Sequence, residues 1–528
     1  MPLLYAKKIK PMFCRVYCAS CNGIDAITVT VEVDITPGVS FNLVGLPDVA
    51  VKESLQRISG ALGHYGFKIP GKRILVNMAP ANIKKEGSAF DLAIAVGLLY
   101  ASGQIVRQDG QTEIYIERKL SGYIIMGELA LDGSLRDFQG ALAIAASARQ
   151  MGFNACIFPR QTAMECIEID DIDIFWADNI EGVIEILEND KQAEKHLCRK
   201  MPYKSNSETL ELYDNDFAYI KGQDVAKRGL EIAAAGGHNI LLSGSPGCGK
   251  TLLARSLSSI MPPMLKEEAV TTSKIHSVAG MLKGGSGLLR ERPFRAPHHT
   301  ASTTSLIGGG SNAMPGEISL AHNGVLFLDE FTEFPRHSIE VLRQPMEDGF
   351  VQISRVKKKV TYPCAFTLVA AMNPCPCGYY NTPGGRCTCS SSAIRKYQSK
   401  ISGPILDRID IQINLQPVPV REIKGGKLSE RSADIAKRVE KARMIQHERY
   451  SSEKFTTNSR LPANLIAKYC PLGKQEEKLL RQIMERQSLS MRSYTRIIKI
   501  ARTIADLSQS TNIEAEHIAG ALCFRSEI

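Results

Sequence analysis

One short glycine-rich segment constrains this chain more than any other. Residues 244–251 read GSPGCGKT and directly follow the apolar run at 239–242. Glycines let the backbone turn tightly and point its N–H groups at anionic oxygens, and the helix that follows presents its positive end to the same anion. The lysine supplies charge for the β- and γ-phosphates, and the threonine hydroxyl can bind Mg²⁺. We therefore expect an ATP-binding loop made of Gly244, Ser245, Pro246, Gly247, Cys248, Gly249, Lys250 and Thr251.

A second segment indicates hydrolysis. Residues 324–330 form a continuous apolar run that ends in Asp329 and Glu330, which is typical of a strand buried in a parallel sheet. Asp329 would share Mg²⁺ with Thr251, and Glu330 would polarise the attacking water. A pair of surface acids at a strand end is the alternative, but the phosphate loop upstream favours a catalytic pair.

Length, apolar runs and cysteines narrow the class of protein. A chain of 528 residues predicts two to four domains. No run of 18 apolar residues occurs, and the start of the chain leads into Lys7 and Lys8 without a signal-peptide core, so we expect a cytoplasmic protein without a membrane partner. The 14 cysteines then indicate reduced thiols or metal ligands instead of disulfides.

Positive charge gathers towards the end of the chain. The net charge is +10, and residues 421–528 hold 21 Lys and Arg against 13 Asp and Glu. Such an excess is typical of a protein that binds nucleic acid. A solvated helical surface explains the charge equally well.

Changes of pattern divide the chain into four segments. Residues 1–188 mix strand-like segments, such as 27–34, with helix-like segments, such as 91–99. Residues 189–212 are polar and predict a linker. Residues 213–420 alternate strands and helices around the ATP motifs, which predicts a doubly wound α/β sheet. Residues 421–528 are helical, with 3.6-residue periodicity at 432–446, 476–486, 494–507 and 513–522.

Three more polar residues fall in the order expected of a ring-forming ATPase. Asn373 ends the buried run 366–372, beside the strand that carries Asp329, and could orient the attacking water. Arg408 precedes another predicted strand, and Arg492 opens a C-terminal helix. An arginine supplied by a neighbouring subunit can stabilise the charge of the transferred phosphoryl group.

Three long strings of residues resemble a known family. Residues 292–300 read RPFRAPHHT, residues 307–310 read IGGG and residues 315–322 read PGEISLAH. Together with the motifs above they resemble the AAA+ class, and within it the magnesium-chelatase-like YifB/ComM family. The resemblance implies an AAA+ P-loop core with a helical C-terminal lid, 421–528, and a homo-oligomer that forms a hexameric ring. It further implies that Asn373 is sensor 1, Arg408 the arginine finger and Arg492 sensor 2.

Two insertions resemble DNA-handling parts of ring helicases. Residues 277–310 are glycine-rich and resemble the helix-2 insert, and residues 349–362 alternate like a hairpin and resemble the pre-sensor-1 hairpin. In that role the hairpin would contact DNA phosphates through Arg355, Lys357, Lys358 and Lys359. A hairpin tip that only aids solubility is the alternative. For His298 and His299 we favour a structural or nucleotide-sensing role over metal binding.

Four cysteines flank one Pro- and Gly-rich loop. Cys375, Cys377, Cys387 and Cys389 form C-x-C, nine residues and C-x-C. Four thiols of this kind can bind structural Zn²⁺, although a single intervening residue leaves little room for two thiolates on one ion. Unbound thiols would be easily oxidised, so we favour zinc over free cysteines.

Residues 1–188 resemble the Lon-protease-like domain of the same family, with the fold of ribosomal protein S5 domain 2. The resemblance rests on residues 45–48, 76–80 and 84–91. Peptide hydrolysis in that fold needs a serine activated by a lysine. Ser88 lies near the position of the serine, but Leu142 occupies the position of the lysine. We therefore expect no peptidase activity, and a role in ring assembly or DNA binding.

The combined motifs favour one function and leave a second open. The first is a Mg²⁺-dependent ATPase that acts as a helicase or translocase on branched or single-stranded DNA, driving branch migration in recombination or natural transformation. The alternative is a chelatase-type motor that remodels a partner protein for metal insertion. The missing lysine argues against an ATP-dependent protease.

Overall fold

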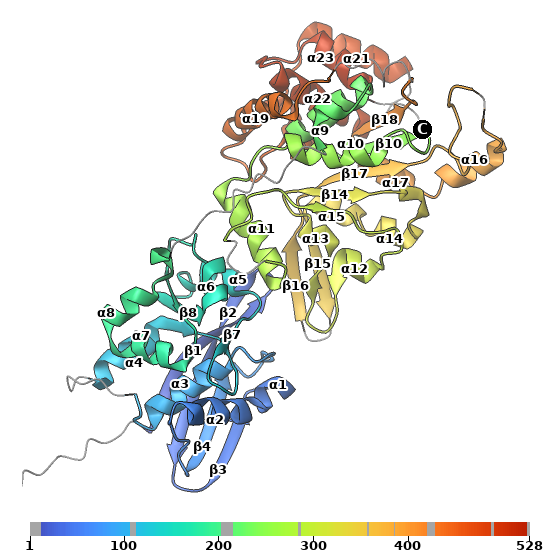
Figure 1. The fold of residues 1–528 in the computed structure, drawn as a ribbon. Helices are drawn as coiled ribbons and strands as arrows, with labels where there is room; N and C mark the ends of the chain where they lie inside the picture. Colours follow the sequence, from blue (N-terminus) through green and yellow to red (C-terminus); the bar gives the residue numbers. More distant parts are fainter. Residues whose placement is uncertain are drawn as a thin grey trace, which may run out of the picture. The chain divides into compact units, whose positions relative to one another are not determined.

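The chain folds into two units, which Figure 1 shows with their helices and strands. The N-terminal unit contains residues 1–207 and 269–289, and the P-loop unit contains residues 208–268 and 290–528. The structure is a computed structural model, and it describes residues 12–105, 112–201, 215–282, 287–355, 358–384, 386–419, 428–486 and 490–524.

A seven-stranded mixed sheet forms the centre of the N-terminal unit. The predicted strand at 27–34 is confirmed within β2, where Val29, Val31 and Val33 alternate towards the core and are fully buried. β2 pairs antiparallel with β1 and β4, whereas β5, β8 and β9 continue the sheet in parallel. The sheet order is β3 (Ser40–Val44), β4 (Arg73–Ala79), β2 (Asp25–Thr36), β1 (Phe13–Asn22), β5 (Tyr123–Ile125), β8 (Ala155–Pro159) and β9 (Asp173–Ala177).

Helix α3 (Asp91–Ala101) packs against this sheet, and all of its residues are buried. A Cβ atom at Gly97 would lie 2.7 Å from Val33 Cγ2, so the glycine permits the close approach of helix and strand. The prediction of a packed helix at 91–99 is therefore confirmed. The remaining elements are α1 (Val49–Lys52), α2 (Ser54–His64), α4 (Thr112–Gly122), β6 (Glu128–Leu129), β7 (Leu135–Arg136), α5 (Ala141–Ala148), α6 (Arg160–Glu165), α7 (Ile180–Glu188) and α8 (Asp190–Ala193).

A segment from the second half of the chain completes the N-terminal unit. Helix α11 (Lys266–Val278) contributes Ser277, whose backbone carbonyl accepts from Gly140 N–H at 3.0 Å and whose hydroxyl accepts from Leu142 N–H at 3.3 Å. Both donors lie at the start of α5, where helix N–H groups lack partners within the helix. The stretch 277–310 is thus divided, because residues up to 289 belong to this unit and later ones to the P-loop unit.

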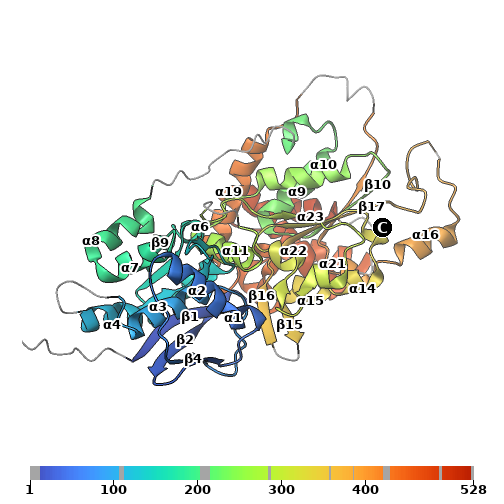
Figure 2. The ribbon, with the colours of Figure 1, turned by 60° about the horizontal axis from the view of Figure 1, so that its bottom comes forward.

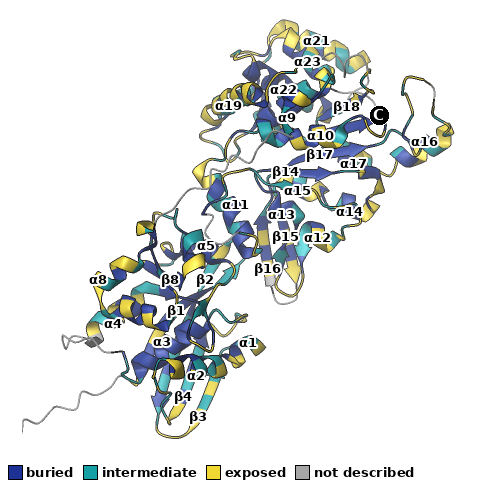
Figure 3. Cartoon of the chain, in the orientation of Figure 1, coloured by how far each residue is buried: buried dark blue, intermediate teal, exposed yellow. Residues whose placement is uncertain are grey.

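A five-stranded parallel sheet forms the core of the P-loop unit, as the sequence predicts. Every residue of its three central strands is buried (Figure 3). Because successive side chains point to opposite faces, both faces of the sheet are covered. The order is β11 (Phe294–Arg295), β14 (Val325–Leu328), β17 (Thr367–Met372), β10 (Ile240–Gly244) and β18 (Ile411–Leu415).

Two small hairpins lie in the segments that connect the strands of this sheet. Between β11 and β14, the pair β12 (Gly308–Gly309) and β13 (Met314–Pro315) separates α12 (Thr303–Ile307) from α13 (Glu317–Leu320). Between β14 and β17, helices α14 (Arg336–Glu340) and α15 (Arg343–Asp348) precede the hairpin of β15 (Phe350–Arg355) and β16 (Lys358–Pro363). The predicted hairpin at 349–362 is therefore confirmed.

Helices close the chain, in the four segments where periodicity predicts them. Helices α19 and α22 pack on α9 (Asp224–Gly236), and α22 packs on α23 (Figure 2). One hydrophobic cluster joins Ile240 of the sheet to Val439 and Ala501 of the lid, so the lid and the sheet share a core. The helices are α19 (Ser432–Arg449), α21 (Lys474–Arg486), α22 (Met491–Leu507) and α23 (Ala515–Leu522), with the shorter α20 (Ile466–Tyr469).

The predicted linker at 189–212 begins with ordered structure. Helix α8 and two 3₁₀ turns, Glu194–His196 and Cys198–Lys200, follow α7, and residues 202–214 lie outside the described part of the chain. Within the described residues, no helix combines the length and apolar character that crossing a membrane requires.

A buried carboxylate ties the lid helices together. Asp506 of α22 has no exposed side-chain surface and accepts from Arg449 Nη1 at 2.9 Å and from Arg502 Nε at 3.0 Å. Its second oxygen also accepts from Asn458 Nδ2 at 2.9 Å. Since a buried charge is costly unless it is paired and hydrogen-bonded, these contacts depend on one another.

Removing this carboxylate should destabilise the protein strongly. Asp506→Ala removes the carboxylate that pairs with Arg449 and Arg502, and we expect the free energy of unfolding to fall by about 3–5 kcal/mol. Denaturant unfolding measures the change. The control is Glu516→Ala in α23, whose side chain is 77% exposed and which should change stability by less than about 0.5 kcal/mol. Equal effects of the two substitutions would contradict the role of Asp506.

Candidate nucleotide site

The phosphate loop turns between β10 and α10 (Lys250–Ser256) in a conformation that favours glycine. Gly247 has φ 77° and Gly249 has φ 92°, both in the left-handed region. A Cβ at Gly244 would lie 2.7 Å from Cys248 Sγ and 2.9 Å from Leu415 Cβ. The loop is therefore packed closely against the end of β18, with its backbone free to face an anion.

Lys250 lies inside this loop, against the end of a second strand. Its Nζ donates to the carbonyl oxygens of Gly244 and Ser245 at 2.7 and 3.0 Å, and to Asn373 Oδ1 at 3.1 Å. Burial lowers the pKa of the lysine. Asn373 follows β17, so the carboxyl ends of two neighbouring strands bring the ammonium group and the amide together.

The third strand of the site supplies the acids. Thr251 Oγ1 donates to Asp329 Oδ2 at 2.8 Å, and Glu330 N–H donates to Asp329 Oδ1 at 2.9 Å. A hydroxyl and a carboxylate in contact are hard oxygen ligands of the kind that Mg²⁺ prefers. Thr251 and Asp329 are therefore the residues that would hold Mg²⁺, as their motifs predict.

His299, for which the sequence favours a structural or nucleotide-sensing role, contacts Glu330, and the sequence did not predict that contact. Its Nδ1 lies 3.0 Å from Glu330 Oε2, and its ring meets Phe334 edge-on. The string RPFRAPHHT singled out the histidine pair, but nothing in its pattern indicated contact with an acid 31 positions later. The structure thus ties Glu330, which itself has φ 51°, to a residue that follows β11.

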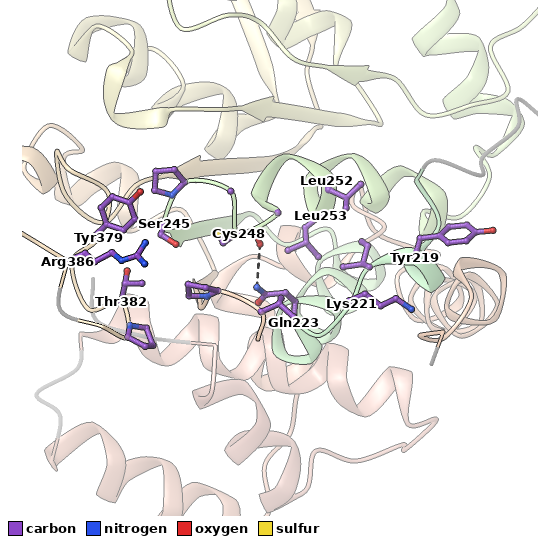
Figure 4. Close-up of a pocket in the computed structure, with 17 residues that line it drawn as sticks. Tyr219, Lys221, Gln223, Ser245, Cys248, Leu252, Leu253, Tyr379, Thr382 and Arg386 are labelled. Carbon is purple, nitrogen blue, oxygen red and sulfur yellow. Dashed lines mark hydrogen bonds between the residues drawn. The ribbon is translucent and has the colours of Figure 1, made fainter. Parts of the chain in front are cut away.

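A cavity of 510 Å³ opens beside the phosphate loop (Figure 4). Its size suits a nucleotide. Gln223 donates to the carbonyl oxygens of Cys248 and Gln416 at 3.4 and 2.7 Å, so it joins the loop to the end of β18. Cys248 is buried, and burial raises its pKa. Besides residues 245–249, the walls include Tyr219, Lys221, Leu253, Tyr379, Thr382 and Arg386, none of which the motifs predicted.

The two predicted arginines lie together in a different concavity. Arg408 pairs with Glu347 and donates through Nη1 to Pro404 O at 2.7 Å, whereas Arg492 Nη1 lies 3.4 Å from Asp407 Oδ2. The hydrogen bond from Arg408 holds the pKa of Glu347 below its ordinary value. Both arginines line a cavity of 420 Å³ whose lining includes no residue of the phosphate loop.

The parallel sheet keeps these two cavities at opposite edges. Arg408 precedes β18, and Ile411 at the start of β18 pairs with Ile240 at the start of β10. The phosphate loop follows β10 at the far end. Five residues of parallel strand span roughly 16 Å. The two arginines therefore lie at the end of the sheet opposite the phosphate loop of their own chain.

The four cysteines of the C-x-C pairs meet in space. The Sγ separations are 3.3 Å for Cys375 and Cys377, 3.8 Å for Cys375 and Cys387, and 3.7 Å for Cys377 and Cys387. The sulfur of Cys389 completes a group whose atoms all lie within 4.8 Å of one another. Hydrogen bonds from the backbone N–H groups of Tyr379 and Thr388 lower the pKa of Cys377 to about 6.

The pleat of the β15–β16 hairpin separates the predicted basic residues. Val351, Ile353, Val360 and Tyr362 are buried on one face, and Lys359 is exposed on the other. A Cβ at Gly309 of β12 would lie 2.8 Å from Arg355 Nη2. The side chain of Arg355 therefore packs on the β12–β13 hairpin. In the backbone register Lys358 pairs with Arg355, and Lys357 lies outside the described residues.

In the N-terminal unit, Ser88, which lies near the position of the peptidase serine, faces the carboxylate of Glu128. The Ser88 hydroxyl donates to Glu128, which also lies 3.3 Å from Arg136. Leu142 is fully buried in α5. The absence of peptidase activity remains a prediction.

Most of the chain matches family models of one class of protein. Three models of the magnesium chelatase subunit ChlI match successive parts of the chain: the subunit ChlI model of Mg-chelatase at residues 31–162, the magnesium chelatase model at 216–423 and the C-terminal model at 429–525. These matches cover part of the sheet of the N-terminal unit, the nucleotide site and the lid helices. The chain is therefore a magnesium-chelatase-like AAA+ protein.

Full-length relatives narrow the class. The chain is 40% identical over 507 residues to the uncharacterized protein YifB of Salmonella typhimurium, covering 96% of this chain and 95% of the relative. It is 39% identical over 518 residues to competence protein ComM of Haemophilus influenzae, covering 97% of each. A magnesium-chelatase 67 kDa subunit of Heliobacterium mobile is 28% identical over 30% of this chain and 28% of its own length. The chain belongs to the YifB/ComM family.

Proposed function

We propose that this chain is a Mg²⁺-dependent ATPase that assembles into a hexameric ring and translocates on branched or single-stranded DNA. The observation that carries the ATPase part is the meeting of Lys250, Asn373, Thr251 and Asp329 at one edge of the parallel sheet. These residues come from three strand ends, and each offers the chemistry that phosphoryl transfer requires. Branch migration in recombination or natural transformation is the process in which we place this activity.

Each residue of the site has a distinct role in this proposal. Lys250 offsets the charge of the β- and γ-phosphates, and Asn373 orients the attacking water. Glu330 polarises that water once it leaves His299. Mg²⁺ held by Thr251 and Asp329 would neutralise charge on the phosphate oxygens. The N–H groups of residues 245–249 supply the remaining hydrogen bonds.

The site is completed by a neighbouring subunit. Arg408 and Arg492 lie together at the edge of the sheet opposite the phosphate loop. An arginine there can reach a nucleotide only if that nucleotide belongs to another chain. We therefore assign both residues to the neighbour's ATP, which requires an oligomer and is satisfied by a closed ring.

The first test separates hydrolysis from binding. Glu330→Gln keeps the shape of the side chain but removes its negative charge, so the attacking water is no longer polarised. We expect the ATPase rate to fall at least about 100-fold, while the dissociation constant for ATP stays within about threefold. Steady-state hydrolysis and equilibrium binding measure the two. Lys250→Ala, which should lose binding as well, is the comparison, and normal hydrolysis by Glu330→Gln would refute the assignment.

The second test asks whether two chains share one site. Lys250→Ala and Arg408→Ala should each be inactive alone. In a mixed ring, an intact phosphate loop from one variant meets an intact arginine from the other, so mixing should restore part of the ATPase rate. Repeating the mixture with Arg492→Ala tests the second arginine. If the arginines act within their own chain, mixing the variants should restore no ATPase activity at any ratio.

Two features support DNA as the substrate. The β15–β16 hairpin presents Lys359 on an exposed face, and Lys357 and Lys358 precede it in the sequence. Cations at a projecting hairpin can follow phosphates without reading bases. The name of the relative from Haemophilus influenzae refers to competence, which is consistent with a role in DNA uptake or recombination.

The third test measures the phosphate contacts. Alanine at Lys357, Lys358 and Lys359 should weaken binding of forked DNA and reduce the slope of log affinity against log salt by about 2, because each phosphate contact releases counterions. The DNA-stimulated ATPase rate should fall to the DNA-free rate. The matched control replaces three exposed lysines of the lid, Lys437, Lys441 and Lys478. A greater loss in the control would place the DNA contact on the lid instead.

The second candidate is a chelatase-type motor that remodels a partner protein for metal insertion. The three ChlI family models favour it, since they match most of the chain. Such a motor uses the same ATP site, and the mixing experiment above gives the same result for both. DNA distinguishes them, because a chelatase-type motor predicts an ATPase rate that forked DNA leaves unchanged.

A further inference from the structure

The loop that follows Asn373 forms a closed group of four thiols. We call residues 375–389 the cysteine knuckle. Tetrahedral coordination with Zn–S bonds of about 2.3 Å requires sulfur separations of about 3.8 Å. Two of the three separations among Cys375, Cys377 and Cys387 are 3.7 and 3.8 Å, and the third is 3.3 Å. All four cysteines are free thiols. Four thiolates and no open position match a structural zinc site.

The cysteine knuckle rests directly on the phosphate loop. Gly378 has φ 84°, and a Cβ atom there would lie 2.7 Å from Pro246 Cδ. Only a glycine leaves room for this approach. The loop is also anchored where it begins, because Gln398 Nε2 donates to Pro374 O at 3.3 Å, next to the Asn373 that accepts from Lys250.

Four residues of the cysteine knuckle line the nucleotide cavity, namely Tyr379, Thr382, Pro383 and Arg386. Tyr379, Thr382 and Arg386 lie near Ser245 on one side of the cavity (Figure 4). Arg386 is exposed and directly precedes Cys387. A metal ion that holds Cys387 in place would therefore also hold the backbone of Arg386 in place. A guanidinium group beside a phosphate loop is suited to bind a polyanion through paired N–H donors.

We propose that Cys375, Cys377, Cys387 and Cys389 bind one Zn²⁺ ion and that the zinc-closed knuckle forms a wall of the ATP site. The ion fixes Tyr379, Thr382 and Arg386 at the cavity, so ATP affinity depends on zinc. This inference rests on the proposed function in one respect, namely that the cavity binds ATP.

The dependence of ATP affinity on zinc has a simple physical origin. The nine residues between Cys377 and Cys387 include three glycines and a proline, and those that the structure describes form neither helix nor strand. Without the ion, ATP would have to order this segment on binding and would lose affinity by that entropic cost. With the ion, the ordering is complete before ATP arrives.

Metal content tests the first part of the proposal. We expect the full-length protein, purified from zinc-supplemented cells, to contain one zinc per chain by mass spectrometry of elements. The double variant Cys387→Ser, Cys389→Ser should contain almost none. Cys523→Ser, which changes an exposed cysteine in the lid, should keep the metal. A wild-type protein without zinc, or a double variant that retains it, would overturn the assignment.

Binding of a fluorescent ATP analogue tests the second part. The double serine variant should bind roughly tenfold more weakly than wild type. Arg386→Ala should weaken binding roughly tenfold while keeping its zinc, because it removes a cation from the wall without touching a ligand. The proposal fails if loss of zinc leaves affinity within about twofold of wild type.

A matched glycine pair tests the contact itself. Gly378→Ala and Gly384→Ala both place a side chain at positive φ in the cysteine knuckle, but only the first meets Pro246, whereas a Cβ at Gly384 has no neighbour within 4 Å. We expect weaker ATP binding for Gly378→Ala and a much smaller change for Gly384→Ala. Equal loss in both would show that strain within the loop, and not contact with the phosphate loop, sets the affinity.

One more variant separates this inference from the proposed function. Lys250→Ala should lose the ATP analogue and keep its zinc. If the wild type binds zinc but no ATP, the proposed function fails and the coupling fails with it, while the metal site stands. If it binds ATP with an affinity that is independent of zinc, the coupling alone is overturned.

Discussion

Parallel pairing of the five strands in the P-loop unit is the constraint on which the rest of this site depends. Parallel strands bring their carboxyl ends to one edge, so Lys250, Asp329 and Asn373 meet although they lie far apart in sequence. The same pairing sends the residues that precede each strand to the other edge, where Arg408 lies. Burial of both faces leaves the edges as the places where polar chemistry can be exposed. The proposed division of the ATP site between two chains rests on this arrangement of the strand ends.

Local patterns predicted the elements, because each depends on residues close in sequence. Glycine spacing identified the phosphate loop, continuous apolar runs identified β14 and β17, and 3.6-residue periodicity identified the lid helices. The segment 269–289 could not be assigned in this way. Helix α11 buries Thr272, Ser273 and Ser277, which are polar, so its contact with the N-terminal unit leaves no apolar stripe in the sequence. Its position depends on hydrogen bonds to Gly140 and Leu142 that no local pattern encodes.

The candidate site shows the same limit. Cysteine spacing predicted a shared metal site, and the four sulfurs do meet, but the approach of Gly378 to Pro246 joins residues 132 positions apart. The contact between His299 and Glu330 likewise depends on the neighbouring strands β11 and β14. For the hairpin, the period of two already implies that Arg355 and Lys359 project from different faces once the register is known. Contacts between residues far apart in the sequence therefore determine the parts of the site that the motifs did not predict.

Division of the chain between its two units has a consequence for how they can be handled and how they can move. The chain passes from one unit to the other near residues 207, 268 and 289, so three covalent connections join them where a simple tandem arrangement would have one. A fragment that ends before the P-loop unit would lack residues 269–289 and leave the N–H groups of Gly140 and Leu142 without acceptors. The N-terminal unit is therefore a discontinuous domain, and three tethers leave it less rotational freedom than a single linker would.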